Sequence, residues 1–138
     1  MNKIRIYLAG TIYKEEPGLN WKQRFMNILN PHNQEPHKYE FFDPDPINEP
    51  EFYMVQRDKA EIEKCDVFVA YIERPSFGTA MEILYAYELK TKPVFIINPN
   101  GSLNNHDGSS TDLWVTYHSS LICHNVEDCA EHIKTIRF

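Results

Sequence analysis

"DVFVAYI", residues Asp66–Ile72, contains a run of apolar residues about as long as one strand. Continuous apolar runs of this length are typical of strands that are buried on both faces of a parallel sheet. The segments on either side, Glu51–Cys65 and Thr79–Lys90, carry apolar residues at helical spacing. A second apolar run, "PVFII" at Pro93–Ile97, follows them. This alternation predicts parallel strands that are joined by helical crossovers.

The same alternation continues outward in both directions. The remaining predicted elements are, in chain order, a strand at Ile4–Gly10, a helix at Leu19–Leu29, a strand at Tyr39–Phe42, a short helix at Leu113–His118, a strand in "SLICH" at Ser120–His124 and a helix at Val126–Ile136. The chain of 138 residues therefore suits one α/β domain, with helices on both faces of a parallel sheet. Ligands of such sheets bind beyond the carboxyl ends of the strands, where we expect the loops Gly10–Gly18, Asp43–Pro50 and Glu73–Gly78.

Composition narrows the possible partners. The net charge of -6, from 14 basic and 20 acidic residues, disfavours binding to polymeric nucleic acid. Three cysteines without a CxxC pair argue against a disulfide framework and favour the cytoplasm. No apolar run is long enough for a secretory signal or a membrane span. The six histidines are scattered without ligand spacing, so the sequence implies neither a metal site nor a cofactor.

Glu82 stands among apolar residues on a predicted helix, in the stretch "PSFGTAMEILYA" at Pro75–Ala86. A carboxylate on such a stripe is unfavourable without partners and tends to become neutral. One explanation is structural: Thr79 and Glu82 match a capping box that satisfies the first turn of the helix. The other explanation is functional, because a nearby helix N-terminus would hold Glu82 ionised as a nucleophile. The residues alone leave both explanations open.

A second carboxylate, Asp58, is also predicted to face inward. It lies three residues after Val55 and four before Ile62, on one face of its predicted helix. A structural explanation is a buried ion pair with Arg57 or Lys59. Two inward carboxylates on consecutive helices instead suggest one nucleophile and one proton donor. This is the pair that cleaves glycosidic bonds with retention of configuration.

Five motifs stand in order along the chain: "IYLAG", "RD" at Arg57-Asp58, "CDVFVAYIE", "PSFGTAMEILYA" and "KPVF". Together, over residues 4–97, they resemble the nucleoside 2-deoxyribosyltransferase family. The resemblance implies a flavodoxin-like fold, a three-layer sandwich with a five-stranded parallel sheet in the order 2-1-3-4-5. It also implies cleavage of the N-glycosidic bond of a 2′-deoxynucleoside through a covalent deoxyribosyl-enzyme.

The resemblance further implies roles for single residues. Glu82 corresponds to the nucleophile that attacks the anomeric carbon, and Asp58 to the carboxylate that handles the proton of the base. Tyr7 corresponds to a tyrosine that orients the nucleophile, although a strand tyrosine is otherwise expected to pack in the core. The loop residues at which family members contact the base correspond to Tyr13, Asp43 and Asp45.

Ser76 departs from the family pattern. Family members carry an aspartate for the sugar hydroxyls at this position, whereas a related 2′-deoxynucleoside 5′-monophosphate N-hydrolase has a serine that binds the 5′-phosphate. A serine hydroxyl beside Gly78 and a helix N-terminus suits a phosphate, which an aspartate would repel. Thr11 would add a second hydroxyl. The hydrolase also uses an arginine in the first loop, where this chain has Lys14 and no arginine. Ser76 is otherwise an ordinary loop or cap residue.

Three functions remain open at this point. The first is transfer of deoxyribose between nucleobases. The second is hydrolysis of (deoxy)nucleoside 5′-monophosphates to free base and sugar phosphate. The third is an inactive nucleotide-binding module, although the presence of Glu82, Asp58 and Tyr7 together counts against it.

The expected partners are small nucleosides or nucleotides, nucleobases and further copies of the chain, with no membrane. The resemblance implies a homo-oligomer whose sites are completed by the C-terminal region of a neighbouring subunit. In this chain that region is Asp112–Ser120. His118 would contact a phosphate or a sugar hydroxyl across the interface, whereas a lone histidine is more commonly structural.

Overall fold

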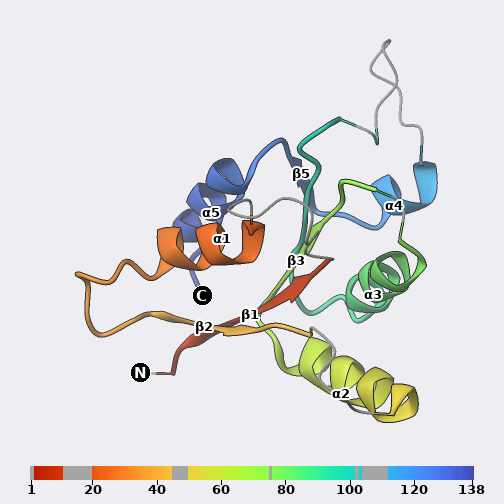
Figure 1. Ribbon diagram of the computed structural model, residues 1–138, viewed down its shortest axis with the longest axis horizontal. Helices are drawn as coiled ribbons and strands as arrows, with labels where there is room; N and C mark the ends of the chain where they lie inside the picture. The colour runs from red at the N-terminus through yellow and green to blue at the C-terminus, as the bar shows by residue number, and fades with distance from the viewer. Residues whose placement is uncertain (1, 11–19, 45–49, 75, 102, 104–111) are drawn as a thin grey trace.

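A parallel sheet of five strands forms the centre of the molecule, in the order β2-β1-β3-β4-β5 (Figure 1). The computed structural model describes residues 2–10, 20–44, 50–74, 76–101, 103 and 112–138. The strands are β1 (Ile4–Ala9), β2 (Tyr39–Phe42), β3 (Val67–Tyr71), β4 (Val94–Ile97) and β5 (Leu121–Cys123). The apolar run Asp66–Ile72 contains β3, which pairs with β1 from Ile6↔Val67 and with β4 from Phe68↔Val94. The flavodoxin-like strand order and the parallel pairing are confirmed.

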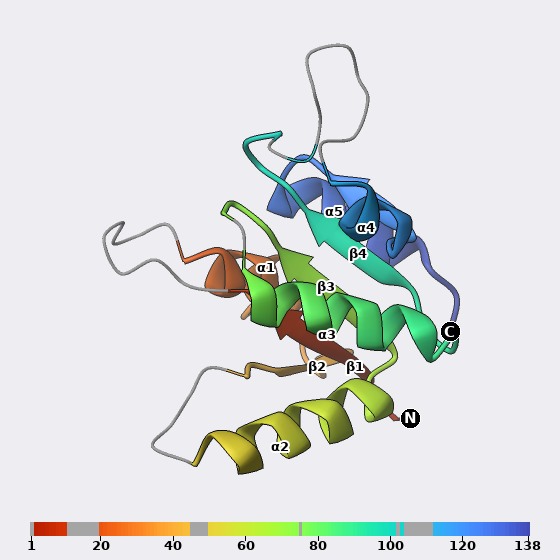
Figure 2. The same cartoon turned by 90° about the vertical axis from the view of Figure 1, so that its right-hand side faces the viewer.

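Helices cover both faces of this sheet. They are α1 (Trp21–Leu29), α2 (Glu51–Lys64), α3 (Phe77–Glu88), α4 (Leu113–Tyr117) and α5 (Val126–Thr135). The helices α1 and α5 pack together on one face, whereas α2 and α3 lie side by side on the other (Figures 1 and 2). The short helix α4 contacts α3. All the predicted helices and strands are therefore present, with ends that differ by at most two residues.

Each face of the sheet has its own hydrophobic core, and β1 contributes to both. Ile6 and Leu8 pack toward α1 and α5, whereas Tyr7 and Ala9 pack toward α2 and α3. This division follows from the alternation of side chains along a strand. Tyr7 is fully buried, between the rings of Phe42 and Phe68, with both ring centroids 5.3 Å from its own. The tyrosine side chain thus enters the same layer as the helices that carry Asp58 and Glu82.

Gly10 directly follows β1, at a position that has room only for glycine. Its φ of +121° lies in the region that favours glycine, and a Cβ atom there would lie 2.6 Å from the Tyr71 carbonyl oxygen. The close approach brings the ends of β1 and β3 together at the carboxyl edge of the sheet.

All three cysteines are buried and free, as the sequence predicted for a chain without a disulfide framework. No helix within the described ranges is long and apolar enough to cross a membrane.

Candidate active site

Glu82 and Tyr7 meet on the face of the sheet that α2 and α3 cover. The Tyr7 hydroxyl donates a hydrogen bond of 2.5 Å to Oε2 of Glu82, although the two residues lie 75 positions apart in the chain. The strand β1 brings the tyrosine, and the second turn of α3 brings the glutamate. Among the described residues, Tyr7 is the one that forms a hydrogen bond with this carboxylate.

The capping explanation for Glu82 is wrong. The helix α3 begins two residues earlier than predicted, and its N-cap is Ser76, whose Oγ accepts from the Thr79 N–H at 3.4 Å. Thr79 is therefore inside the first turn, and Glu82 lies too far along the helix to reach back to the cap. The position of Glu82 is explained instead by its bond with Tyr7.

Asp58 reaches the same region from α2 as half of an ion pair. Its Oδ1 lies 3.3 Å from Nη2 of Arg57, and both side chains are half-buried. The ion pair that the sequence offered as a structural explanation is thus present. Val55, expected on the inward face, is 56% exposed, because only the later turns of α2 pack on the sheet, through Ile62.

Burial and neighbouring charges shift the pKa values of Glu82 and Tyr7. Burial raises the pKa of Glu82, the bond from Tyr7 lowers it, Asp58 raises it, and Lys22 lowers it. Burial also raises the pKa of Tyr7 strongly, with further contributions from Glu82 and Asp58. The Tyr7 hydroxyl therefore keeps its proton and acts as a donor. Asp58 thus contributes to the raised pKa of both Tyr7 and Glu82.

Lys22 is a buried cation at the start of α1 that the sequence did not single out. Its side chain is only 1% exposed, and its Nζ lies 2.5 Å from Oδ1 of Asp43, the residue that follows β2. Its burial could have been predicted from helical spacing. Lys22 lies three residues before Phe25 and seven before Leu29, on the buried stripe of α1. Asp43, a predicted base-contact residue, is thus held at the carboxyl edge of the sheet.

The predicted phosphate-binding residues are brought together only in part. Ser76 and Gly78 lie exposed at the start of α3, and a Cβ atom on Gly78 would meet nothing within 4 Å. A ligand has room to approach the backbone there. Thr11 and Tyr13, like Lys14 and Asp45, lie outside the described residues.

His118 lies apart from this cluster, where α4 packs on α3. It is buried, with Nδ1 2.6 Å from the Trp114 carbonyl oxygen and Nε2 3.5 Å from Oε1 of Glu88. The ring of Tyr87 meets its imidazole edge-on, with centroids 5.1 Å apart. These contacts give His118 a structural role in joining α4 to α3.

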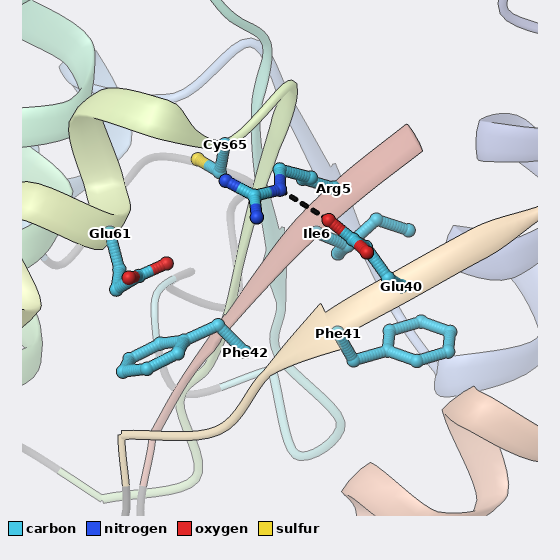
Figure 3. A pocket seen from close by; sticks show the side chains of 7 residues that line it. All are labelled: Arg5, Ile6, Glu40, Phe41, Phe42, Glu61 and Cys65. Atoms are coloured by element: carbon cyan, nitrogen blue, oxygen red, sulfur yellow. Dashed lines mark hydrogen bonds and ion pairs between the residues drawn. The ribbon is translucent and has the colours of Figure 1, made fainter. Parts of the chain in front are cut away.

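The hollow drawn in Figure 3 is a different feature. It has a volume of about 220 Å³ and lies between β2 and the end of α2. An ion pair of Arg5 with Glu40 forms part of its wall. None of the three predicted catalytic residues lines it. Within the described parts of the chain, no three His, Cys, Asp or Glu side chains gather closely enough to hold a metal ion.

Comparison with known proteins gives matches among solved structures. No protein-family model matches the sequence, and no match was found among curated proteins. A 2-desoxiribosyltransferase from Leishmania mexicana has a TM-score of 0.70 and 17% identity, over 97% of this chain and 99% of its own. The chain has the fold of a 2-desoxiribosyltransferase. The CMP N-glycosidase BcmB from Clostridium botulinum matches with a TM-score of 0.62 and 18% identity, over 94% of this chain and 97% of its own.

The resemblance drawn from five short motifs is therefore confirmed at the level of the fold. The parallel strands β1, β2 and β3 end at one edge of the sheet, where Asp43 directly follows β2, while Tyr7 of β1 bonds to Glu82 of α3. Because one fold hosts many activities, the activity has to be argued from these side chains.

Proposed function

We propose that the protein cleaves the N-glycosidic bond of a 2′-deoxynucleoside and transfers the deoxyribosyl group to another nucleobase. The observation that carries this proposal is the 2.5 Å hydrogen bond from the Tyr7 hydroxyl to Glu82. It fixes one carboxylate oxygen in a part-buried position, which suits a nucleophile, and Asp58 comes near enough to affect both groups. The fold shared with a 2-desoxiribosyltransferase supports the same class of reaction.

In the first step Glu82 attacks the anomeric carbon. Because Tyr7 holds Oε2, Oε1 forms the new ester bond while the bond between the anomeric carbon and the base breaks. The electron pair of the broken bond leaves with the base. Asp58, which is ionised in its pair with Arg57, takes up a proton from water and passes it to the base. The products of this step are a deoxyribosyl ester of Glu82 and a free base.

In the second step another nucleobase resolves the ester. The incoming base loses a proton to the Asp58 carboxylate and attacks the anomeric carbon. The ester bond breaks, and its electron pair returns to Glu82. Two displacements at one carbon retain its configuration. Water in place of the base would give hydrolysis, so the acceptor separates transferase from hydrolase.

The start of α3 favours a second candidate, hydrolysis of (deoxy)nucleoside 5′-monophosphates. Ser76 is the exposed N-cap of this helix, and the surroundings of Gly78 are open. A phosphate would accept from the Ser76 hydroxyl and from N–H groups of the first turn, whose dipoles favour an anion. Ser76 precedes Glu82 by six residues, about 9 Å along a helix axis. The similarity to a CMP N-glycosidase supports this candidate.

We also propose that the protein is a homo-oligomer with sites shared between subunits. Six large apolar side chains on two contacting helices, all at least 40% exposed, support this. They are Phe77, Met81 and Leu84 of α3 and Leu113, Trp114 and Tyr117 of α4, and they define the α3–α4 apolar surface. Exposed apolar surfaces of this kind mark protein interfaces. A contact between His118 and substrate across such an interface stays a prediction.

The proposed function is tested by separating reaction products chromatographically. The protein is incubated with deoxynucleosides plus a different free base, and separately with ribo- and deoxynucleoside 5′-monophosphates. Exchange of bases is the expected result. Glu82→Gln keeps the shape of the side chain but removes the nucleophile, so the rate falls by about a thousandfold or more. After acid quenching, mass spectrometry locates a deoxyribosyl group on the peptide that contains Glu82.

Glu131→Gln is the matched control, because it changes an exposed glutamate on α5, across the sheet from the site. It keeps full activity. If the protein releases free base from monophosphates and exchanges no bases between deoxynucleosides, it is the hydrolase and not the transferase. If the protein binds these compounds saturably but converts none of them, both the transferase and the hydrolase activity are refuted. The protein is then an inactive nucleotide-binding module.

A further inference from the structure

Arg57 holds the proposed acid, Asp58, through two hydrogen bonds. Its Nε and Nη2 atoms both lie 3.3 Å from Oδ1 of that carboxylate. Neighbouring residues on a helix do not normally face each other, so the long arginine side chain has to turn toward Asp58. The two side chains are only 25% and 22% exposed, and solvent therefore screens this pair less than a pair on the surface. The pair can fix the acid in place if the arginine is itself fixed.

Two contacts from the end of β2 fix the arginine. Its Nη2 donates to the carbonyl oxygen of Pro44 at 3.3 Å, and its guanidinium carbon lies 5.6 Å from the centroid of the Phe42 ring. A planar guanidinium can pack on a ring and donate hydrogen bonds at the same time, whereas the ammonium of a lysine cannot match this geometry. One guanidinium therefore joins α2 to the end of β2.

Phe42 continues this series of contacts toward the nucleophile. Its ring centroid lies 5.3 Å from that of Tyr7, and the Tyr7 hydroxyl donates to Glu82 at 2.5 Å. Contacts thus run without a break from the acid on α2 to the nucleophile on α3. A reaction that needs both carboxyl groups at one substrate depends on their relative position. The arginine is the member of the series that touches the acid.

We propose that Arg57 is a positioning residue that holds the carboxyl group of Asp58 where it delivers a proton to the leaving base. The inference deepens the proposed function and rests on it, including the role of Asp58 as the acid. The guanidinium keeps its own protons throughout, and the transferred proton moves from Asp58 to the base. The simpler role is that Arg57 only fastens the end of β2 to α2. The two roles differ in which substrates depend on the arginine.

The test compares substrates whose bases differ in their need for a proton. Guanine gains a proton when it leaves 2′-deoxyguanosine. In 7-methyl-2′-deoxyguanosine the base already carries a positive charge and leaves without one. Among pyrimidines, 5-fluoro-2′-deoxyuridine has a more acidic base than 2′-deoxyuridine, which is therefore the better leaving group. All four are supplied as nucleosides and as 5′-monophosphates. Release of the base, which both candidate activities share, is followed by chromatography with the protein in excess, so that the first step alone is measured.

Arg57→Lys and Arg57→Met are the informative variants. Arg57→Lys keeps a positive charge beside Asp58, so it keeps the fold even if Arg57→Met unfolds. We expect release of guanine to slow by about tenfold in Arg57→Lys and about a hundredfold in Arg57→Met, and release of 7-methylguanine by less than about threefold. The 5-fluoro substrate should lose less than 2′-deoxyuridine.

Arg24→Lys is the matched control, because it makes the same change in an arginine of α1, on the opposite face of the sheet. The Arg24 guanidinium lies 3.9 Å from the carboxylate of Glu127, and its side chain is 42% exposed. Its rates should equal those of the wild-type protein with every substrate.

Equal losses with both members of a substrate pair would show that Arg57 serves the fold or substrate binding, and the inference would be overturned. Unchanged rates in both Arg57 variants would overturn it as well. If the wild-type protein releases base from none of the substrates, the proposed function fails and this inference fails with it. If the wild-type protein releases base and Glu82→Gln does not, but the Arg57 variants treat both members of each pair alike, the inference about Arg57 alone fails.

Discussion

The Glu82 carboxyl group is subject to opposing influences from its surroundings. Burial and the charge of Asp58 favour its neutral acid, whereas the Tyr7 hydroxyl and the Lys22 ammonium favour the carboxylate. The net result is a pKa above the ordinary value of 4.5. A reaction that needs the carboxylate therefore loses rate as the pH falls through this raised pKa, and its acid limb lies above the pH at which an exposed glutamate titrates.

Tyr7→Phe removes the hydroxyl that stabilises this carboxylate. We expect the acid limb of kcat to move to higher pH, because the bond that lowers the pKa of Glu82 is lost. We also expect kcat to fall by about a hundredfold, because the nucleophile loses its orientation. Steady-state rates measured across the pH range check both effects.

Tyr39→Phe is the matched control, because it changes another buried tyrosine at the start of β2, the opposite end of the sheet. Its profile should coincide with that of the wild-type protein. The ring contacts of residue 7 with Phe42 and Phe68 remain in Tyr7→Phe, so the melting temperature changes little. An unchanged profile in Tyr7→Phe would show that the hydrogen bond does not serve the reaction.

At the residue scale, the sequence singled out Glu82, Asp58 and Tyr7, each with a structural explanation beside the catalytic one. A lone carboxylate on an apolar helix stands out, and Glu82 does hold a specific partner. Lys22 was missed because lysine is normally expected at the surface and no local pattern shows that Asp43 will lie beside it. The cap of α3 was misplaced because Ser76 and Thr79 are both good caps three residues apart, and packing selects the earlier one.

At the scale of elements, apolar runs and helical spacing predicted each helix and strand that the described residues form. Their success has a physical reason, since the inner strands β1, β3 and β4 are buried on both faces and the sheet-facing sides of the helices are apolar. Helical spacing of apolar residues could not show which turns of a helix pack on the sheet and which extend beyond it. Val55 has the spacing of a core residue but lies exposed, because the first turns of α2 extend beyond the sheet.

Gly10→Ala tests the close contact between the ends of β1 and β3. The new Cβ atom would lie 2.6 Å from the Tyr71 carbonyl oxygen on a backbone with φ of +121°. We expect the free energy of unfolding to fall by more than about 1 kcal/mol, as measured by urea denaturation. Gly78→Ala is the control, since it meets nothing within 4 Å and lies in a helix. Equal stabilities for both variants would contradict this account of Gly10.

At the scale of the whole molecule, the α3–α4 apolar surface distinguishes an isolated subunit from an assembled one. Trp114→Glu and Met81→Glu place charges on it, so we expect the wild-type protein to form an oligomer and the variants to dissociate. Sedimentation at several protein concentrations measures this change. Phe138→Glu is the control, because Phe138 is exposed to a similar degree but lies outside this surface. A wild-type protein that stays monomeric at high concentration would contradict the shared-site proposal.

The position of β1 between β2 and β3 has a consequence for how the protein is synthesised. This strand pairs with β3 some sixty positions later, from Ile6↔Val67, and its tyrosine bonds to a residue 75 positions later. While the chain emerges from the ribosome, the edge of β1 that pairs with β3 stays unpaired until β3 has been synthesised. The catalytic arrangement can form only after the start of α3 has also emerged. Pairings between distant segments form slowly and leave apolar strands exposed in the meantime. The nascent chain is therefore most open to misassociation before α3 is complete.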